Sequence, residues 1–153
     1  MIAPAALAGL IAERAPRVLV LGDALLDTWL TGPARRLGRD APVPVVELHS
    51  RRYAPGGAAN VAANLAALGA TVELLSVVGA DEGGATLLDV VRAHGVEVGC
   101  VVQDPTRPTP VKHRLATAGQ TVARFDVGPD RPVRGHPQAA LHTIRSPLTR
   151  IDP

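Results

Sequence analysis

The stretch PGGAANVAANL, residues 55–65, indicates how the rest of this chain folds. Gly56 and Gly57 let the backbone approach another group closely, and they stand directly before an alanine-rich helical segment. Asn60 follows within one turn, and Gly69 ends the segment. A corner of this kind can hold a polar small molecule between backbone N–H groups and one side-chain amide. The same residues also suit an ordinary loop-to-helix junction, in which the glycines serve only tight packing.

Apolar strands and helices alternate around this corner. Residues 17–22 and 71–78 are short runs rich in branched side chains that end near glycine, which predicts buried parallel strands, and residues 96–102 predict a third. Asp81 is placed to cap a helix over residues 82–93. This alternation predicts an α/β fold built on a parallel sheet.

Two further regions are β-prone. Residues 43–49 lie among prolines, which predicts either an edge strand or a separate small sheet. Residues 111–117 and 121–126 are expected to pair as a hairpin. Residues 127–153 contain five prolines and scattered arginines that interrupt any periodic pattern, so we expect a poorly ordered tail there.

Composition and charge argue against several classes of protein. The formal net charge is +2, and residues 127–153, with four arginines and two aspartates, account for all of it. The chain therefore lacks the basic stripe of a nucleic-acid-binding protein. No segment approaches the ~18 consecutive apolar residues of a membrane-spanning helix. Cys100 is the only cysteine, which favours a reducing compartment and hence the cytoplasm.

The glycine corner and the segments before it resemble a known family. The spacing from Gly56-Gly57 through Asn60 to Gly69 and Gly79 resembles the N-terminal signature of the PfkB/ribokinase family of carbohydrate kinases. One branch of that family, the kinases of D-glycero-β-D-manno-heptose 7-phosphate, is similar in three more segments. These are GDALLD (residues 22–27), GPARR (residues 32–36) and DAPVPVVE (residues 40–47).

The resemblance extends over about residues 17–126 and implies a definite architecture. It implies a ribokinase-like, Rossmann-type parallel sheet with flanking helices, incomplete at its C-terminal side. A small β lid would be formed by about residues 43–49 and 111–126. We therefore expect residues 1–126 to be the N-terminal part of a kinase domain, followed by a divergent tail over residues 127–153.

The resemblance also implies a set of sugar-binding residues. Asp27 matches the family's sugar-binding aspartate, and Gly56, Gly57 and Asn60 match other sugar contacts. The strand pattern alone places Asp27 just beyond the C-terminal end of the first strand, where open α/β sheets bind ligands. The alternative is that Asp27 is a loop residue or caps a helix. For Asp23, sugar binding and capping of the following turn remain equal alternatives.

A phosphorylated substrate would require cations near the site. Lys112 is the first candidate, because residues 112 and 114 share one face of the lid-strand segment; a solvated face is the alternative. The available cations are Arg35, Arg36, Arg51, Arg52, Lys112 and Arg114.

Phosphoryl transfer needs parts that this sequence does not contain. The family uses ATP and Mg²⁺, with its catalytic base in a Gly-Ala-Gly-Asp motif and its metal in an Asn/Glu motif, and neither motif occurs here. Gly79-Ala80-Asp81 lacks the second glycine, so we interpret Asp81 as a helix cap. We therefore assign no catalytic, cofactor-binding or metal-binding residue.

The expected function is the sugar-binding half of a heptose 7-phosphate kinase, inactive alone. The alternatives are a non-catalytic module that binds sugar phosphates or dimerises through the β lid, and a kinase of another sugar. The expected partners are a sugar phosphate and a second copy of the chain, with neither nucleic acid nor a membrane.

Overall fold

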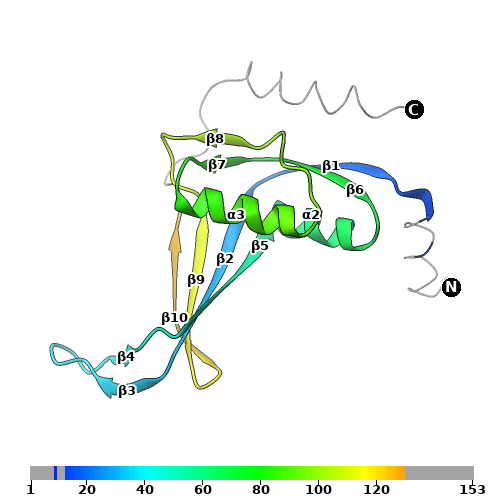
Figure 1. Ribbon diagram of the computed structural model, residues 1–153. Helices are drawn as coiled ribbons and strands as arrows, with labels where there is room; N and C mark the ends of the chain where they lie inside the picture. Colours follow the sequence, from blue (N-terminus) through cyan, green and yellow to red (C-terminus); the bar gives the residue numbers. More distant parts are fainter. Residues whose placement is uncertain (1–8, 10–12, 130–153) are drawn as a thin grey trace.

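A computed structural model describes residue 9 and residues 13–129 of the protein. The described chain has two parts (Figure 1): parallel strands with two helices, and an antiparallel-rich sheet that extends away from those helices. Nearly all of the predicted tail, residues 127–153, lies outside the described residues. No described helix is both long and apolar enough to cross a membrane.

The first part contains two pairs of parallel strands. Strand β1 (Arg17–Leu21) pairs with β6 (Thr71–Leu75), and β7 (Val77–Gly79) pairs with β8 (Val102–Asp104). The strand predicted over residues 71–78 is thus divided at Ser76. The Ser76 side chain is buried, its Oγ accepts the N–H of Ala24 at 3.0 Å, and its carbonyl accepts the N–H of Val102 at 2.9 Å.

The prediction of a strand over residues 96–102 is wrong. Only Glu97 forms a bridge there, with Glu73, and β8 begins at Val102. The N–H of Val101 donates to the carbonyl of Val98 at 3.1 Å, so the chain turns where an extended ladder was expected. Local apolar composition favoured a strand, but it does not encode this turn.

Helices α2 (Ala58–Ala67) and α3 (Glu82–Ala93) agree with the sequence-based prediction to within a residue or two. Helix α2 buries only small side chains, those of Ala59, Ala62 and Ala63, which allows close packing on the strands. Helix α3 buries larger ones, including Leu87 and Val91. Both helices contribute to a single core of Ala, Val and Leu side chains.

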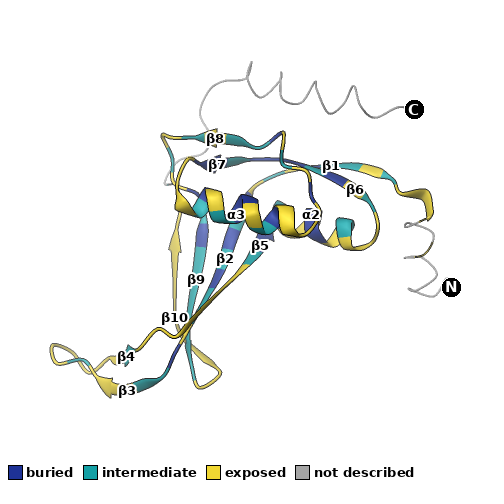
Figure 2. Cartoon of the chain, viewed as in Figure 1, coloured by how far each residue is buried: buried dark blue, intermediate teal, exposed yellow. Residues whose placement is uncertain are grey.

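The second part is a four-stranded sheet in the order β10-β9-β2-β5, which we call the lid sheet. Its strands are β2 (Ala24–Thr31), β5 (Ser50–Gly57), β9 (Val111–Thr117) and β10 (Gln120–Val127). The expected hairpin is present as β9 and β10, but β2 and β5 are not among the predicted strands. Figure 2 shows that β2 alternates between more and less buried residues, whereas β10 is exposed along its length.

A two-stranded extension lies at the far end of the lid sheet (Figure 1). It pairs β3 (Ala34–Leu37) with β4 (Pro44–Val46), which agrees with the separate small sheet expected around residues 43–49.

Candidate functional site

Asp27 lies inside strand β2, which corrects the expectation that it follows the first strand in a loop. It pairs with Ala54 of β5 on one side and with Lys112 of β9 on the other. Because directly paired residues share a face, Asp27 and Lys112 point to the same side of the lid sheet. Successive residues alternate, so Thr28 belongs to the opposite side.

The glycine corner lies directly against Asp27. A methyl group placed on Gly56 would come within 2.7 Å of Oδ2 of Asp27, so the carboxylate lies over a residue that has no side chain. Gly57 precedes helix α2 with φ of 58°, in the left-handed region. A methyl group there would come within 2.3 Å of the Asp23 carbonyl oxygen. Gly57 is therefore required by its backbone conformation and close approach, and a side chain at Gly56 would displace Asp27 or Leu25.

The corner presents donors for a ligand. Gly57 caps α2 without a side-chain hydrogen bond, and the first turn of the helix contains no acidic residue. Asn60 lies in that first turn and is exposed. The structure thus brings Asp27, Gly56 and Gly57 together, with Asn60 three residues further along the chain from Gly57.

Asp27 shares its face of the sheet with several cations. The Arg114 guanidinium donates to Oδ1 of Asp27 at 2.5 Å, and both side chains are partly buried. Arg114 also lies 5.0 Å from the ring centre of Trp29, and Arg52 lies 4.3 Å from the same centre. Lys112 is the register partner of Asp27. Arg114 neutralises Asp27 directly, and Arg124 of β10 pairs with Asp126 on the same face. Arg52 and Lys112 therefore leave this face positive.

The other cations considered from the sequence do not lie on the Asp27 face. Arg51 lies on the opposite face, since its neighbour Arg52 pairs with Trp29. Arg35 and Arg36 belong to β3, at the far end of the lid sheet (Figure 1). Sequence reasoning missed Trp29 altogether, although the alternation around Asp27 places it on the same face of a strand.

Asp81 is a helix cap, as expected. Its carboxylate accepts the N–H of Gly84 at 2.8 Å, the N–H of Thr109 at 2.9 Å and the Thr109 hydroxyl at 2.6 Å. Burial by itself raises the pKa of the Asp81 carboxyl, but the bonds from Thr109 and Gly84 outweigh it and lower the pKa below the ordinary 3.8. The cap therefore ties α3 to the segment that enters β9.

Replacing Asp81 with asparagine should reduce stability at neutral pH by about 1 kcal/mol, because the amide is a weaker acceptor for these donors. The pKa of Asp81 is lower in the folded state than in the unfolded state, so the ionised carboxylate stabilises the fold above about pH 4. This stabilisation is lost as the pH falls through the folded-state pKa. The difference between wild type and Asp81→Asn should therefore shrink in acid. Urea unfolding at about pH 7 and about pH 3 measures it; a difference that is equal at both pH values contradicts the assignment.

The described residues offer no evident metal centre. Among residues 9 and 13–129 there is no group of three or more His, Cys, Asp or Glu side chains that could hold a metal ion. We assign none of the described residues to an Mg²⁺ site.

Comparison with protein families gives a match over residues 15–142 to the pfkB family of carbohydrate kinases. The chain belongs to that family. The match continues beyond residue 126, where the family-like motifs end, and the boundary expected at 126/127 remains a prediction.

Relatives and solved structures are consistent with this membership. The bifunctional protein HldE of Geobacter sulfurreducens is 43% identical over 118 residues, covering 73% of this chain and 24% of that protein. HldE of Azorhizobium caulinodans is 41% identical over 125 residues, covering 81% of this chain and 26% of that protein. The chain therefore spans about a quarter of the length of these curated relatives.

The predicted ribokinase-like α/β fold is confirmed. A carbohydrate kinase from Agrobacterium tumefaciens superimposes with a TM-score of 0.62 and 26% identity, covering 73% of this pfkB-family chain and 35% of that one. A ribokinase from Arabidopsis thaliana, solved with ribose and ATP, superimposes with a TM-score of 0.59 and 22% identity. The match covers 76% of this chain and 37% of that one.

Proposed function

We propose that this chain forms the sugar-phosphate-binding part of a pfkB-family kinase whose substrate is a heptose 7-phosphate. The observation that carries the proposal is the position of Asp27, which lies over Gly56 on a face that also bears Lys112 and Arg52. A carboxylate accepts hydrogen bonds from sugar hydroxyls, and nearby cations attract a phosphate. The similarity to HldE proteins supports the heptose branch.

Each residue has a distinct part in the proposed binding. Asp27 accepts from sugar hydroxyls, while Arg114 holds the carboxylate in one orientation through its ion pair. The N–H of Ala58 is bonded to the Asp23 carbonyl, so the backbone N–H groups that follow it, together with the Asn60 amide, bind further hydroxyls. Lys112 binds the substrate phosphate, because it is the register neighbour of Asp27 on the same face. These groups bind and orient the substrate.

Phosphoryl transfer itself is not assigned to any described residue. ATP and Mg²⁺ are the donor and metal that the family implies, and ATP would supply the transferred phosphoryl group. No residue present matches the catalytic base or the amides that would stabilise the transferring phosphate. We propose that the 153-residue chain binds its substrate in the cytoplasm and is catalytically inactive alone.

Calorimetric titration of the chain with D-glycero-β-D-manno-heptose 7-phosphate tests this proposal. We expect saturable binding that Asp27→Asn weakens by at least about tenfold, equivalent to 1.4 kcal/mol. Lys112→Ala should weaken the binding of the phosphorylated sugar and leave the affinity for free heptose unchanged. Arg51→Ala removes a matched cation from the opposite face and should change neither affinity. Trp29 is the only tryptophan and lies on the Asp27 face, so its fluorescence gives a second measurement of binding there.

Two outcomes would overturn parts of the proposal. Equal binding by wild type and Asp27→Asn, with circular dichroism showing both folded, would remove the proposed site. Sustained ADP release by the chain with heptose 7-phosphate, ATP and Mg²⁺ would refute inactivity. Binding without ADP release is the expected result.

We also propose that the chain forms a homodimer through β10. This strand ends the lid sheet, all of its residues are exposed, and it carries Val122, Phe125 and Val127. An open strand of this kind can pair with its copy and bury apolar side chains. Light scattering on the titration samples should then give the mass of two chains, and strand pairing would leave both faces of the lid sheet open.

A further inference from the structure

A tryptophan flanked by two arginines lies beside Asp27 on the lid sheet. Trp29 follows Asp27 by two residues on β2, so the two residues share a face and are separated by about 7 Å along the strand. The register places Arg52 of β5 on one side of Trp29 and Arg114 of β9 on the other. Both guanidinium groups contact the indole ring, at 4.3 Å and 5.0 Å from the ring centre. The ring therefore keeps two like charges close together.

The two arginines differ in their carboxylate partners. Arg114 donates to Asp27, and a third arginine of this face, Arg124, donates to Asp126 through Nε at 3.0 Å and Nη2 at 2.8 Å. Arg52 is exposed and has no ion pair with any residue that the structure describes. An anion bound beside Arg52 would balance its charge and reduce its repulsion by the second guanidinium on the ring.

Lys112 lies in a different electrostatic environment from Arg52. Its register partners across the sheet are Asp27 of β2 and Asp126 of β10, so a carboxylate stands on each side of it. The register partner of Arg52 is the uncharged Trp29. The charge of Lys112 is therefore partly balanced, whereas that of Arg52 is not, and a phosphate gains more from contact with Arg52.

We propose that Arg52, positioned by Trp29, binds the phosphate of the substrate and gives the site its preference for a phosphorylated sugar over a free one. The inference rests on the sugar-phosphate site proposed above, in which Asp27 holds the sugar hydroxyls and Lys112 supplies a second cation to the phosphate. A guanidinium presents parallel N–H donors that match two phosphate oxygens. Stacking on the indole ring restricts Arg52 before the ligand arrives, so less side-chain freedom is lost on binding.

Calorimetric titration of the 153-residue chain with heptose 7-phosphate and with free heptose tests the role of Arg52. Arg52→Gln should weaken the phosphorylated sugar at least about tenfold and change the affinity for the free sugar by less than about twofold. Arg52→Lys keeps the charge but loses the planar fork, so its affinity should lie between those of wild type and Arg52→Gln. The salt dependence of binding should also be smaller in Arg52→Gln than in wild type.

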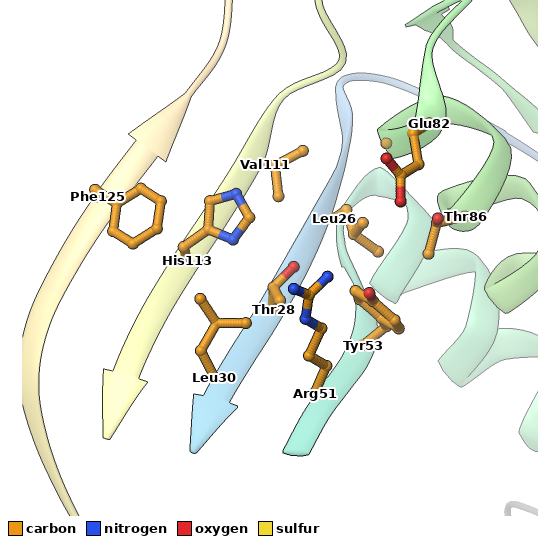
Figure 3. Close-up of a pocket in the computed structure, with 11 residues that line it drawn as sticks. Leu26, Thr28, Leu30, Arg51, Tyr53, Glu82, Thr86, Val111, His113 and Phe125 are labelled. Carbon is orange, nitrogen blue, oxygen red and sulfur yellow. The ribbon is translucent and has the colours of Figure 1, made fainter. Parts of the chain in front are cut away.

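Arg51→Gln is the matched control for Arg52→Gln. Arg51 is the preceding residue on β5, and Figure 3 shows it on the opposite face of the sheet together with Thr28 and His113. This variant should change neither affinity. All variants should show the circular dichroism spectrum and cooperative melting of a folded chain.

Substitutions of Trp29 test its positioning role. Trp29→Phe keeps an aromatic face for Arg52 and should bind heptose 7-phosphate nearly as wild type does. Trp29→Leu removes that face and should weaken the phosphorylated sugar at least about threefold, with the affinity for free heptose unchanged in both variants. Equal weakening of both sugars by Trp29→Leu would indicate a general structural role and would contradict the positioning of Arg52.

Inorganic phosphate provides a test that does not depend on the sugar. It should change the fluorescence of Trp29 saturably in wild type and in Arg51→Gln, but not in Arg52→Gln. Equal affinity of wild type and Arg52→Gln for heptose 7-phosphate would overturn the inference, and weaker binding by Asp27→Asn in the same series would leave the proposed sugar site intact. If neither sugar binds to wild type, the proposed function fails, and the response of Trp29 to phosphate then decides for or against Arg52.

Discussion

Replacing Gly57 with alanine is expected to lower the free energy of unfolding by about 2–4 kcal/mol. Two costs add at this position. The backbone has φ of 58°, a conformation that alanine rarely adopts, and the new methyl group would come within 2.3 Å of the Asp23 carbonyl oxygen. That oxygen already accepts the N–H of Ala58 at 2.9 Å, so it cannot move away without breaking the first contact of α2.

Gly95→Ala is the matched control for this variant. Gly95 also has a positive φ, 78°, but a methyl group there would meet nothing within 4 Å. Only the conformational cost of about 1 kcal/mol should remain. Urea unfolding of both variants measures the difference, and equal losses would show that the contact with Asp23 is not a constraint.

The Gly57 variant also bears on the proposed function. Any movement that relieves the clash shifts the glycine corner against Asp27, which lies over the adjacent Gly56. Sugar-phosphate binding should therefore fall together with stability in Gly57→Ala, whereas Gly95→Ala should keep its affinity. A folded Gly57→Ala protein that binds as tightly as wild type would argue against the corner as a ligand site.

Gly84→Ala is expected to destabilise the protein by about 2–3 kcal/mol. Gly84 is buried in the first turn of α3, and a methyl group would come within 2.2 Å of the Gly79 carbonyl oxygen and 2.9 Å of the Thr109 hydroxyl. The Gly79 backbone and Thr109 are held to one another, since the N–H of Gly79 donates to that hydroxyl at 2.8 Å. The helix would have to withdraw from the Asp81 cap.

The neighbouring Gly83→Ala variant provides the comparison. The nearest atom to its methyl group would be the end of a side chain, Cγ2 of Val111, at 3.1 Å, and the next atoms would lie at 3.4 Å or more. A small shift of that methyl group relieves the contact, and alanine favours the helix by up to about 1 kcal/mol. Thermal unfolding should give a large loss for Gly84→Ala and a change within about 1 kcal/mol for Gly83→Ala; similar melting temperatures would contradict the packing described for Gly84.

Local chemistry made part of the fold predictable. Helices α2 and α3, the Asp81 cap and the β9–β10 hairpin depend on residues close together in the sequence, and each was found from short patterns. Strand β5 was missed because SRRYAPGG contains a proline and two glycines, which local propensity assigns to a turn. It is a strand because β2 supplies its hydrogen bonds, with Leu26 opposite Pro55.

The candidate site was likewise predictable only in part. The family resemblance identified Asp27, the two glycines, Asn60 and Lys112, but not how they are arranged. Trp29 and the ion pair between Arg114 and Asp27 depend on parallel pairing of β2 with β9, two segments more than 80 residues apart. No local pattern specifies that pairing.

The sequence by itself determined the glycine corner, the helix that follows it and membership in the pfkB family, because these depend on backbone geometry and residue order within short segments. Only the tertiary structure decided which side of the lid sheet each residue occupies. In a strand a register shift of one residue moves every side chain to the other face. The pairing of β2 with β5 and β9 therefore separates Asp27 and Lys112 from Thr28 and His113, and so creates two different surfaces from alternating residues.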